Sequence, residues 1–303
     1  MTNIGEQGVT MKTCIQSALI AAFGFAISVS AHAQQSAPVP VSFTNAQGIA
    51  LKGFLFAAAA SETDVPRGAV IMMHGCGGAY SYSQPNAGYT NIQTLFREWG
   101  NALVRDGYVA LLVDSFTGRT DPSTGAAVPQ NQCGNGAAGV SEVKDRPLDA
   151  LAGYDYLVRT ASVRVDPHRI ALLGWSHGGS SVMAALSTTQ ARQPFRAGVS
   201  FYPGCGLYGA FGGIVNSAYV PYAPFKIFHG EADPLYMTGY CQTRRDRAWQ
   251  AGDTNFRIIE EYAGARHSFD GCRSVSGSCI LEDVVAKSKA DAAARNFFSD
   301  MLR

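Results

Sequence analysis

The residues Arg169-Ile-Ala-Leu-Leu-Gly174-Trp175-Ser176-His177-Gly178-Gly179 decide the fold class of this chain. An apolar, strand-like run leads into the pattern Gly-x-Ser-x-Gly, and a helical pattern begins near Gly179. Glycines allow a turn that is too tight for side chains, and such a turn lifts the serine hydroxyl above the edge of a sheet. The serine also lies at the positive end of the next helix, which favours negative charge there. The alternative is a turn with a structural role only.

Short apolar runs alternate with helical patterns on both sides of this turn. Strands are expected at residues 39–44, 50–56, 69–73, 108–113, 169–173, 197–202, 225–228 and 256–262, and helices at 91–105, 148–160, 180–188, 242–250 and 281–302. Runs that are apolar on both faces and separated by helices are typical of a mostly parallel sheet with helices on both faces. No repeat or low-complexity linker divides the chain. We therefore expect a single α/β domain.

Two connections, residues 115–140 and 204–223, are longer than most loops in compact domains. Both follow strands, so both emerge at the carboxyl end of the sheet, where open α/β folds bind ligands. We expect Phe116, Arg119 and Tyr208 on these loops to line a substrate pocket. The alternative is that such side chains pack the loops onto the sheet.

The charge balance excludes one class of partner. The 303 residues carry 24 Lys and Arg against 23 Asp and Glu, which gives a net charge of +1. A chain without an excess of basic residues cannot neutralise many phosphates, so nucleic acid is not expected as a partner. The 47% hydrophobic content also argues against an acidic disordered chain. The sequence gives no indication of oligomeric state.

The N-terminus predicts export. Lys12 precedes an apolar run at residues 18–29, and Ala31-His32-Ala33 follows as a cleavage site. This pattern is typical of a secretory signal peptide, here residues 1–33, which leaves a mature domain of residues 34–303 outside the cytoplasm, secreted or periplasmic. A membrane anchor is the alternative. A helix of twelve residues spans only about 18 Å, however, and a helix needs ~20 residues to cross a bilayer. Met11 is an alternative start.

Cleavage would remove Cys14 and leave six cysteines, namely Cys76, Cys133, Cys205, Cys241, Cys272 and Cys279. An even number in an exported protein predicts disulfides. Cys272 and Cys279 enclose a short polar loop and are the first pair to expect. Zinc is the alternative, but neither C-x-x-C nor H-E-x-x-H occurs.

A serine becomes a nucleophile only when a base takes its proton and a third group orients the base. His267 is the expected base because its loop joins the last strand to the last helix, from where it can reach over the sheet. Among the remaining histidines of the mature chain, His168 precedes a strand and so lies at the wrong end of the sheet, and the side chain of His177 is expected to point away from Ser176. His74 and His229 end strands, and packing or bracing roles are expected for them.

Asp233 is the expected orienting acid, since it follows the strand at residues 225–228 and precedes a proline. Glu231 is the alternative, whereas Asp270 lies too close to His267 in the sequence to reach round it easily. The order Ser176, Asp233, His267 is the nucleophile, acid and base order of α/β-hydrolases.

The attack also needs donors for an oxyanion. The strand at residues 69–73 leads into His74-Gly75-Cys76-Gly77-Gly78, a loop whose backbone can approach a substrate closely. The expected donors are the backbone amides of Cys76 and His177. This role leaves the Cys76 sulfur free for a disulfide.

From about residue 67 to residue 302 the chain resembles the dienelactone hydrolase family of α/β-hydrolases. The resemblance is carried by His74-Gly-Cys-Gly-Gly78, Asp114-Ser-Phe-Thr-Gly-Arg119, Gly174-Trp-Ser-His-Gly-Gly179, Gly230-Glu-Ala-Asp233 and His267-Ser-Phe269. It implies an α/β-hydrolase fold with Ser176, Asp233 and His267 as the triad. The family's sheet order also implies the disulfides Cys76–Cys133 and Cys205–Cys241.

Three positions depart from the enzymes that give the family its name. They have a cysteine nucleophile where this chain has Ser176, a glutamate in the oxyanion loop where it has Gly75, and an arginine four residues after the histidine where it has Gly271. Arg119 is similar to their other carboxylate-binding arginine, with the spacing off by one. The chain therefore resembles the broader esterase branch.

We thus expect an exported serine hydrolase that cleaves small carboxylic esters or lactones through an acyl-enzyme, with no metal or organic cofactor and no stable membrane anchor. Histidine titrates near pH 6.5, so activity is expected to fall as the pH drops through about 6. A serine peptidase on the same fold is one alternative. A hydrolase-like binding protein without catalysis is the other.

Overall fold

The computed structural model describes residues 1–2, 37–61, 64–81, 91–121, 123–128, 130–133, 139–206 and 219–303. The chain divides into two units, Met1–Gln34 and Gln35–Arg303. Only Met1 and Thr2 of the first unit are described, so the expected signal peptide lies outside the described residues. The second unit contains all of the secondary structure described below.

One eight-stranded sheet runs through the second unit in the order β1-β2-β4-β3-β5-β6-β7-β8. Its strands are β1 (Val39–Thr44), β2 (Ala50–Phe56), β3 (Arg67–Met73), β4 (Val109–Asp114), β5 (Val165–Trp175), β6 (Ala197–Phe201), β7 (Phe225–Gly230) and β8 (Phe256–Tyr262). β2 pairs antiparallel with β1 and β4, and the strands from β4 to β8 pair parallel. The prediction of a mostly parallel α/β sheet is confirmed.

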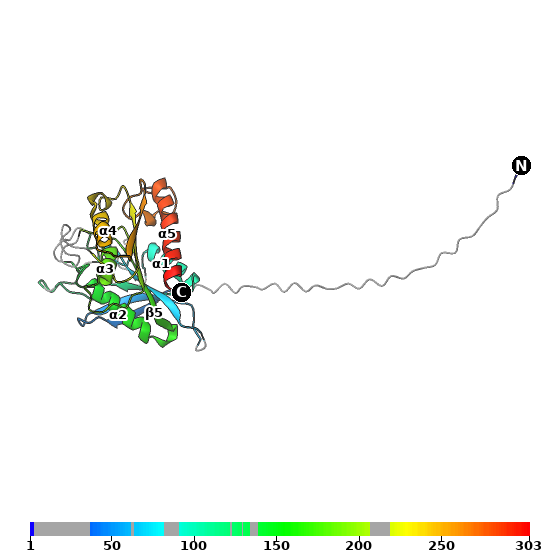
Figure 1. The fold of residues 1–303 in the computed structure, drawn as a ribbon. Coiled ribbons are helices and arrows are strands. Elements are labelled where there is room, and N and C mark those ends of the chain that lie inside the picture. The colour runs from blue at the N-terminus through cyan, green and yellow to red at the C-terminus, as the bar shows by residue number, and fades with distance from the viewer. Residues whose placement is uncertain are drawn as a thin grey trace. The chain divides into compact units, whose positions relative to one another are not determined.

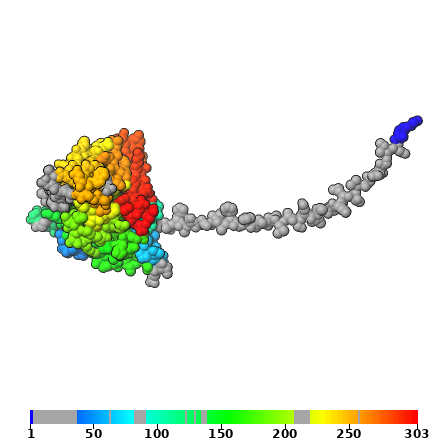
Figure 2. Space-filling model, viewed as in Figure 1, coloured from blue at the N-terminus to red at the C-terminus, as the bar shows by residue number. Residues whose placement is uncertain are grey.

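Helices cover both faces of the sheet (Figure 1). They are α1 (Thr94–Arg105), α2 (Arg146–Arg159), α3 (His177–Leu186), α4 (Tyr240–Gln250) and α5 (Leu281–Met301). Alternate residues of a strand point to opposite faces. Ile71 of β3 accordingly packs in one core with α2, α3 and α4, whereas Val70 and Met72 pack in the other with α1 and α5. In Figure 2 the surface of α5, in red, borders the yellow-to-orange surface of the β7–β8 region.

The elements around Ser176 differ in extent from the prediction. β5 runs from Val165 to Trp175, so it is longer at both ends than residues 169–173, partly because Val165 pairs with Arg67 of β3. α3 begins at His177, immediately after the turn, instead of near Gly179. The serine is therefore the residue that ends the strand and precedes the helix.

Three disulfides link the six cysteines of the second unit: Cys76–Cys133, Cys205–Cys241 and Cys272–Cys279. The first joins the loops after the neighbouring strands β3 and β4, and the second joins the loop after β6 to the start of α4, which follows the neighbouring strand β7. These are the expected pairs. Among the helices that the structure describes, none is both long and apolar enough to cross a membrane.

Candidate active site

Ser176 forms the sharp turn between β5 and α3. Its φ of 51° and ψ of −115° lie in a region that residues with side chains rarely adopt. Its N–H donates to the Phe201 carbonyl of β6 at 2.9 Å, and its carbonyl accepts from the Ser180 N–H at 2.9 Å. The strained backbone is thus held from both sides, by the neighbouring strand and by the first turn of the helix.

Close packing explains the two glycines of the Gly-x-Ser-x-Gly pattern. A Cβ on Gly178 would lie 2.0 Å from the Met73 carbonyl oxygen, and one on Gly174 would lie 2.2 Å from the Gly178 carbonyl oxygen. Both neighbours are backbone atoms of packed elements, so they cannot move aside. The turn can approach the end of β3 only because these positions have no side chain.

His267 reaches over Ser176 from the loop between β8 and α5. Its Nε2 lies 3.1 Å from Ser176 Oγ, and its Nδ1 lies 2.7 Å from Asp233 Oδ2 in the loop after β7. When Nδ1–H donates to the carboxylate, Nε2 is left to accept the proton of the serine hydroxyl. The three residues named from the sequence therefore form one hydrogen-bonded chain at the carboxyl end of the sheet.

Asp233 is buried and surrounded by donors. Its Oδ1 accepts from the Leu235 amide at 2.8 Å, and His229 Nδ1 lies 3.5 Å from Oδ2. Burial acts to raise the pKa of Asp233, but the contacts with His229, His267 and Leu235 outweigh burial and hold this pKa below its usual range. The carboxylate is therefore ionised and can stabilise an imidazolium. The competing Glu231 is exposed to solvent.

The glycine-rich loop after β3 passes beside the serine. A Cβ on Gly75 would lie 3.7 Å from Ser176 Cβ. Cys76 follows and is tied to Cys133 by a disulfide. His177 is the first residue of α3, and the first amides of a helix have no acceptor within the helix. The backbones of Cys76 and His177, which were expected to supply oxyanion donors, thus lie on the segments that flank Ser176.

Two further histidines brace this region. His74 is buried; its Nδ1 lies 2.8 Å from the Gly75 carbonyl, and its Nε2 accepts from the Ser115 amide at 3.1 Å. His177 Nδ1 lies 2.7 Å from Nη1 of the buried Arg146. Burial, reinforced by Arg146, holds the pKa of both imidazoles well below the usual range of histidine. Both imidazoles are therefore neutral and brace this region, and His267 is the candidate base because its Nε2 faces the Ser176 hydroxyl.

Ser176 and His267 open into a cleft of about 570 Å³. Its lining includes the large side chains of Leu95, Phe96, Trp175 and Tyr202 and the polar side chains of Ser81, Gln93, Thr94, Ser268, Asp270 and Arg273. Clefts of this size with a few convergent polar groups bind small organic molecules. Among the residues that the structure describes, no three His, Cys, Asp or Glu side chains are grouped so as to hold a metal ion.

Residues 56–302 match the model of the dienelactone hydrolase family. The chain belongs to this family. It is accordingly a hydrolase with an α/β-hydrolase fold. A comparison with curated protein sequences finds no significant match.

Solved structures of other family members and of related enzymes share the fold. A dienelactone hydrolase-like promiscuous phosphotriesterase from metagenomic libraries is 19% identical, with 88% of this chain and 100% of that chain covered and a TM-score of 0.60. Esterase 2 of Thermogutta terrifontis, solved after phosphorylation by paraoxon, is 17% identical, with 88% and 95% covered and a TM-score of 0.59. Dipeptidyl peptidase 4 of Porphyromonas gingivalis is 16% identical, with 89% and 36% covered and a TM-score of 0.60.

Two of the side chains that the sequence suggested for substrate binding, Phe116 and Arg119, do not line the cleft of this dienelactone hydrolase family member. Phe116 is fully buried and packs its ring against His177 and Arg146. Arg119 is 8% exposed and its guanidinium lies 2.6 Å from Asp149, so a structural ion pair occupies it. Both expectations are corrected: these residues pack the loop after β4, as the alternative had it. Tyr208 lies outside the described residues.

The sequence reasoning also passed over polar and aromatic groups that do line the cleft. Asp270 was set aside because it is close to His267, yet its carboxylate binds Tyr202 and Trp175. The signal available was an acidic residue directly after the apolar Phe269 in the short turn Ser268-Phe269-Asp270. Such a carboxylate is buried only when donors from elsewhere in the fold meet it.

Proposed function

We propose that this member of the dienelactone hydrolase family is an exported serine esterase that cleaves small carboxylic esters or lactones. The observation that carries the proposal is the hydrogen-bonded chain from Ser176 through His267 to Asp233, with the hydroxyl open to a cleft of about 570 Å³. A hydroxyl, an imidazole and a carboxylate in this order are the groups that acyl transfer to serine needs.

In the first half of the reaction, Ser176 Oγ attacks the acyl carbon while His267 Nε2 takes the hydroxyl proton. The negative charge passes to the former carbonyl oxygen, which the backbone amides of Cys76 and His177 stabilise. The imidazolium then gives its proton to the leaving alcohol oxygen as the ester bond breaks. Ionised Asp233 stabilises the imidazolium throughout.

In the second half, a water molecule gives a proton to His267 Nε2 and attacks the acyl-enzyme. The bond between Ser176 Oγ and the acyl carbon breaks, and the proton returns to the serine oxygen. The same residues thus serve both halves. The positive-φ turn supports this role, because backbone strain is retained where the surroundings fix a group for function.

Export is proposed for residues 34–303 after removal of residues 1–33. The three disulfides support it, since such bonds persist in oxidising compartments. N-terminal sequencing of protein recovered outside the cytoplasm is expected to begin at Gln34. Recovery of the uncleaved chain from the cytoplasm would contradict this part of the proposal.

The test is hydrolysis of p-nitrophenyl acetate and butyrate by oxidised residues 34–303 and by Ser176→Ala. We expect the variant to lose a factor of roughly 10³ or more in kcat. Ser288→Ala is the matched control, because Ser288 is an exposed serine of α5 that lines a different hollow. It should retain wild-type turnover.

Paraoxon supplies an independent titration of the same serine, since it phosphorylates an esterase with this fold. Wild type and Ser288→Ala are expected to gain one diethylphosphoryl group and to lose activity, whereas Ser176→Ala should gain none. Turnover of peptide amides in preference to esters would favour the peptidase alternative. A folded wild type that neither turns over esters or amides nor reacts with paraoxon would contradict the catalytic proposal.

A further inference from the structure

Asp270 is a buried carboxylate that the triad does not use. It lies in the short helical turn η4 (Phe269–Gly271) and has no solvent exposure. Its Oδ1 accepts from the Tyr202 hydroxyl at 2.5 Å, and its Oδ2 accepts from the Trp175 indole N–H at 2.6 Å. Each carboxylate oxygen is thus matched to a donor from a different strand end.

Tyr202 connects Asp270 to the candidate base. It follows β6 directly, is 2% exposed and has a φ of 38°, which is rare for a residue with a side chain. Its ring centroid lies 4.6 Å from that of His267, with an angle of 60° between the planes. The hydroxyl bond to Asp270 fixes the direction of the ring, and the ring in turn limits where the imidazole can lie.

Trp175 connects Asp270 to the candidate nucleophile. It is the last residue of β5 and immediately precedes Ser176, whose backbone is strained. Its indole is 2% exposed and packs against Phe96 of α1 and Phe201 of β6. A single carboxylate therefore joins the chain segment before the serine to the aromatic ring beside the histidine.

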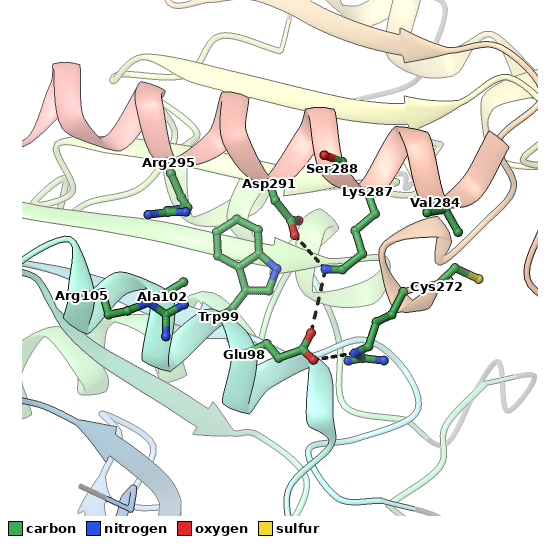
Figure 3. A pocket seen from close by; sticks show the side chains of 11 residues that line it. Glu98, Trp99, Ala102, Arg105, Cys272, Val284, Lys287, Ser288, Asp291 and Arg295 are labelled. Atoms are coloured by element: carbon green, nitrogen blue, oxygen red, sulfur yellow. Dashed lines mark hydrogen bonds and ion pairs between the residues drawn. The ribbon is translucent and has the colours of Figure 1, made fainter. Parts of the chain in front are cut away.

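Charged groups on other elements surround this carboxylate. Lys287 and Asp291 of α5 interact with it electrostatically and also pair with each other at 2.7 Å (Figure 3). Burial raises the pKa of Asp270 to about 6, with Asp291 adding to the increase, while the bonds from Tyr202 and Trp175 and the charge of Lys287 oppose it. Burial keeps the Tyr202 pKa well above its usual range, so this hydroxyl remains a donor.

We propose that Asp270 is a positioning residue of the active site, which holds Tyr202 against His267 and Trp175 beside Ser176 and so keeps base and nucleophile aligned. This inference rests on the proposed function, because the alignment matters only if Ser176 and His267 react. It is a different role from that of Asp233, which contacts the imidazole directly. When Asp270 gains a proton, one of its two oxygens becomes a poorer acceptor, and one of the two bonds weakens.

The first test compares wild type with Asp270→Asn across a range of pH. The amide has nearly the same shape but no charge, and its NH₂ group cannot accept from Tyr202 or Trp175. We expect kcat at pH 7.5 to fall roughly 10–100-fold, because small misplacements of reacting groups cost about that much. KM should stay close to the wild-type value, since Asp270 acts through other residues.

The pH profile separates positioning from a merely structural role. In wild type, Asp270 gains a proton as the pH falls through about 6, so log kcat should fall more steeply on the acid side in wild type than in Asp270→Asn, whose amide takes up no proton there. Asp291→Asn is the matched control: it should keep the slope of wild type and move only the Asp270 step to lower pH, because it removes a neighbouring negative charge. Equal slopes in wild type and Asp270→Asn would overturn the proposal.

Two further measurements test the proposal if Asp270→Asn fails to fold or if the wild type hydrolyses no ester. Tyr202→Phe deletes only one of the two bonds, so it should fold and lose kcat by a smaller factor than Asp270→Asn.

The imidazole proton resonances of His267, assigned by their absence in His267→Asn, report the position of the Tyr202 ring without any turnover. They should shift in Asp270→Asn and stay unchanged in Asp291→Asn. If the wild type hydrolyses no ester but this shift occurs, the proposed function fails and the positioning stands; no shift overturns the positioning.

Discussion

Two hollows in the described part of the chain are nearly equal in size but opposite in character. The cleft at Ser176 has a volume of about 570 Å³, and the hollow between α1 and α5 has a volume of about 600 Å³. Figure 3 shows that several charged side chains of the second hollow pair with one another, since dashed lines join Lys287 to Asp291 and to Glu98. Glu98 binds Arg273 at 2.5 Å, and Lys287 binds Asp291 at 2.7 Å. Its charges therefore link helices and the loop after η4.

The cleft instead contains groups that their surroundings hold in unusual states. Ser176, Tyr202 and Ser268 all line it and all have positive φ, whereas no residue lining the second hollow has this backbone conformation among those described. In the cleft, Nε2 of His267 faces the hydroxyl of Ser176, and this reactive pair is open to a ligand. Volume thus does not distinguish a site from a surface hollow, but strain and reactive pairing do.

The difference between the cleft and the second hollow is tested most directly by replacing one carboxylate at each of them with its amide. In Asp233→Asn an uncharged amide faces His267 Nδ1 and no longer holds the imidazole in the tautomer that leaves Nε2 free to accept a proton, so kcat should fall by a factor of roughly 10³–10⁴. Asp291→Asn breaks an ion pair with Lys287 and removes a negative charge near Asp270, which is already ionised at pH 7.5, so kcat at this pH should stay close to wild type. Ester hydrolysis by both variants is the measurement. Similar losses in the two would mean that the second hollow also takes part in the reaction.

The disulfides offer a second comparison, because Cys76 and Cys133 line the cleft and Cys272 lines the other hollow. Cys76–Cys133 closes a loop over a sequence separation of 57, so Cys76→Ala with Cys133→Ala should lower the free energy of unfolding by roughly 4 kcal/mol. It should also reduce kcat, because the Cys76 amide is a proposed oxyanion donor.

Cys272–Cys279 spans only 7 residues, and its removal should cost roughly 2 kcal/mol. Urea unfolding and ester hydrolysis of both double variants provide the data. The loss of activity should be larger for the Cys76 pair. Unchanged kcat after removal of Cys76–Cys133 would contradict the placement of the oxyanion donor in this loop.

The buried acid of the cleft should leave a signature in stability. Because the pKa of Asp270 is raised to about 6 in the folded protein, its favourable contribution is fully present below the unfolded pKa of about 3.9 and is lost as the pH rises through 6. The loss amounts to about 3 kcal/mol. The free energy of unfolding of wild type should therefore decline relative to Asp270→Asn between pH 4 and pH 7.

Urea unfolding of both proteins at pH 4, 5, 6 and 7 measures this difference. If the free energies of unfolding of the two proteins differ by the same amount at every pH, then the pKa of Asp270 is not raised in the folded protein. A decline would show that the ionised carboxylate of Asp270 lowers the stability of the protein above pH 6, and such a loss of stability is common at functional sites.

Local patterns were sufficient to predict the sheet and the three residues that form the hydrogen-bonded chain. The strands at residues 39–44, 50–56 and 256–262 have the predicted bounds, since apolar runs between turn residues mark them directly. Ser176, Asp233 and His267 were found because each follows a strand, and the carboxyl ends of parallel strands meet at one edge of the sheet. Such signals lie within a few neighbouring residues.

Contacts between distant segments could not be predicted in this way. Arg119 is 30 residues from Asp149, and nothing near either residue in the sequence indicates that they pair. Asp270 is separated by 68 residues from Tyr202 and by 95 from Trp175. The start of α3 was misplaced for a related reason: the backbone strain at Ser176 depends on β3 and β6, which pack around the turn.

The smallest expected effect concerns the ion pairs of the second hollow. Glu98 and Arg273 are each more than 40% exposed, so water and salt screen their attraction. Glu98→Gln should therefore lower the free energy of unfolding by less than about 1 kcal/mol and leave kcat unchanged. Thermal unfolding in low and high salt checks this, since the difference from wild type should shrink as salt is added. A loss of activity in Glu98→Gln would instead show that Arg273, which also lines the cleft, depends on this pair to reach the substrate.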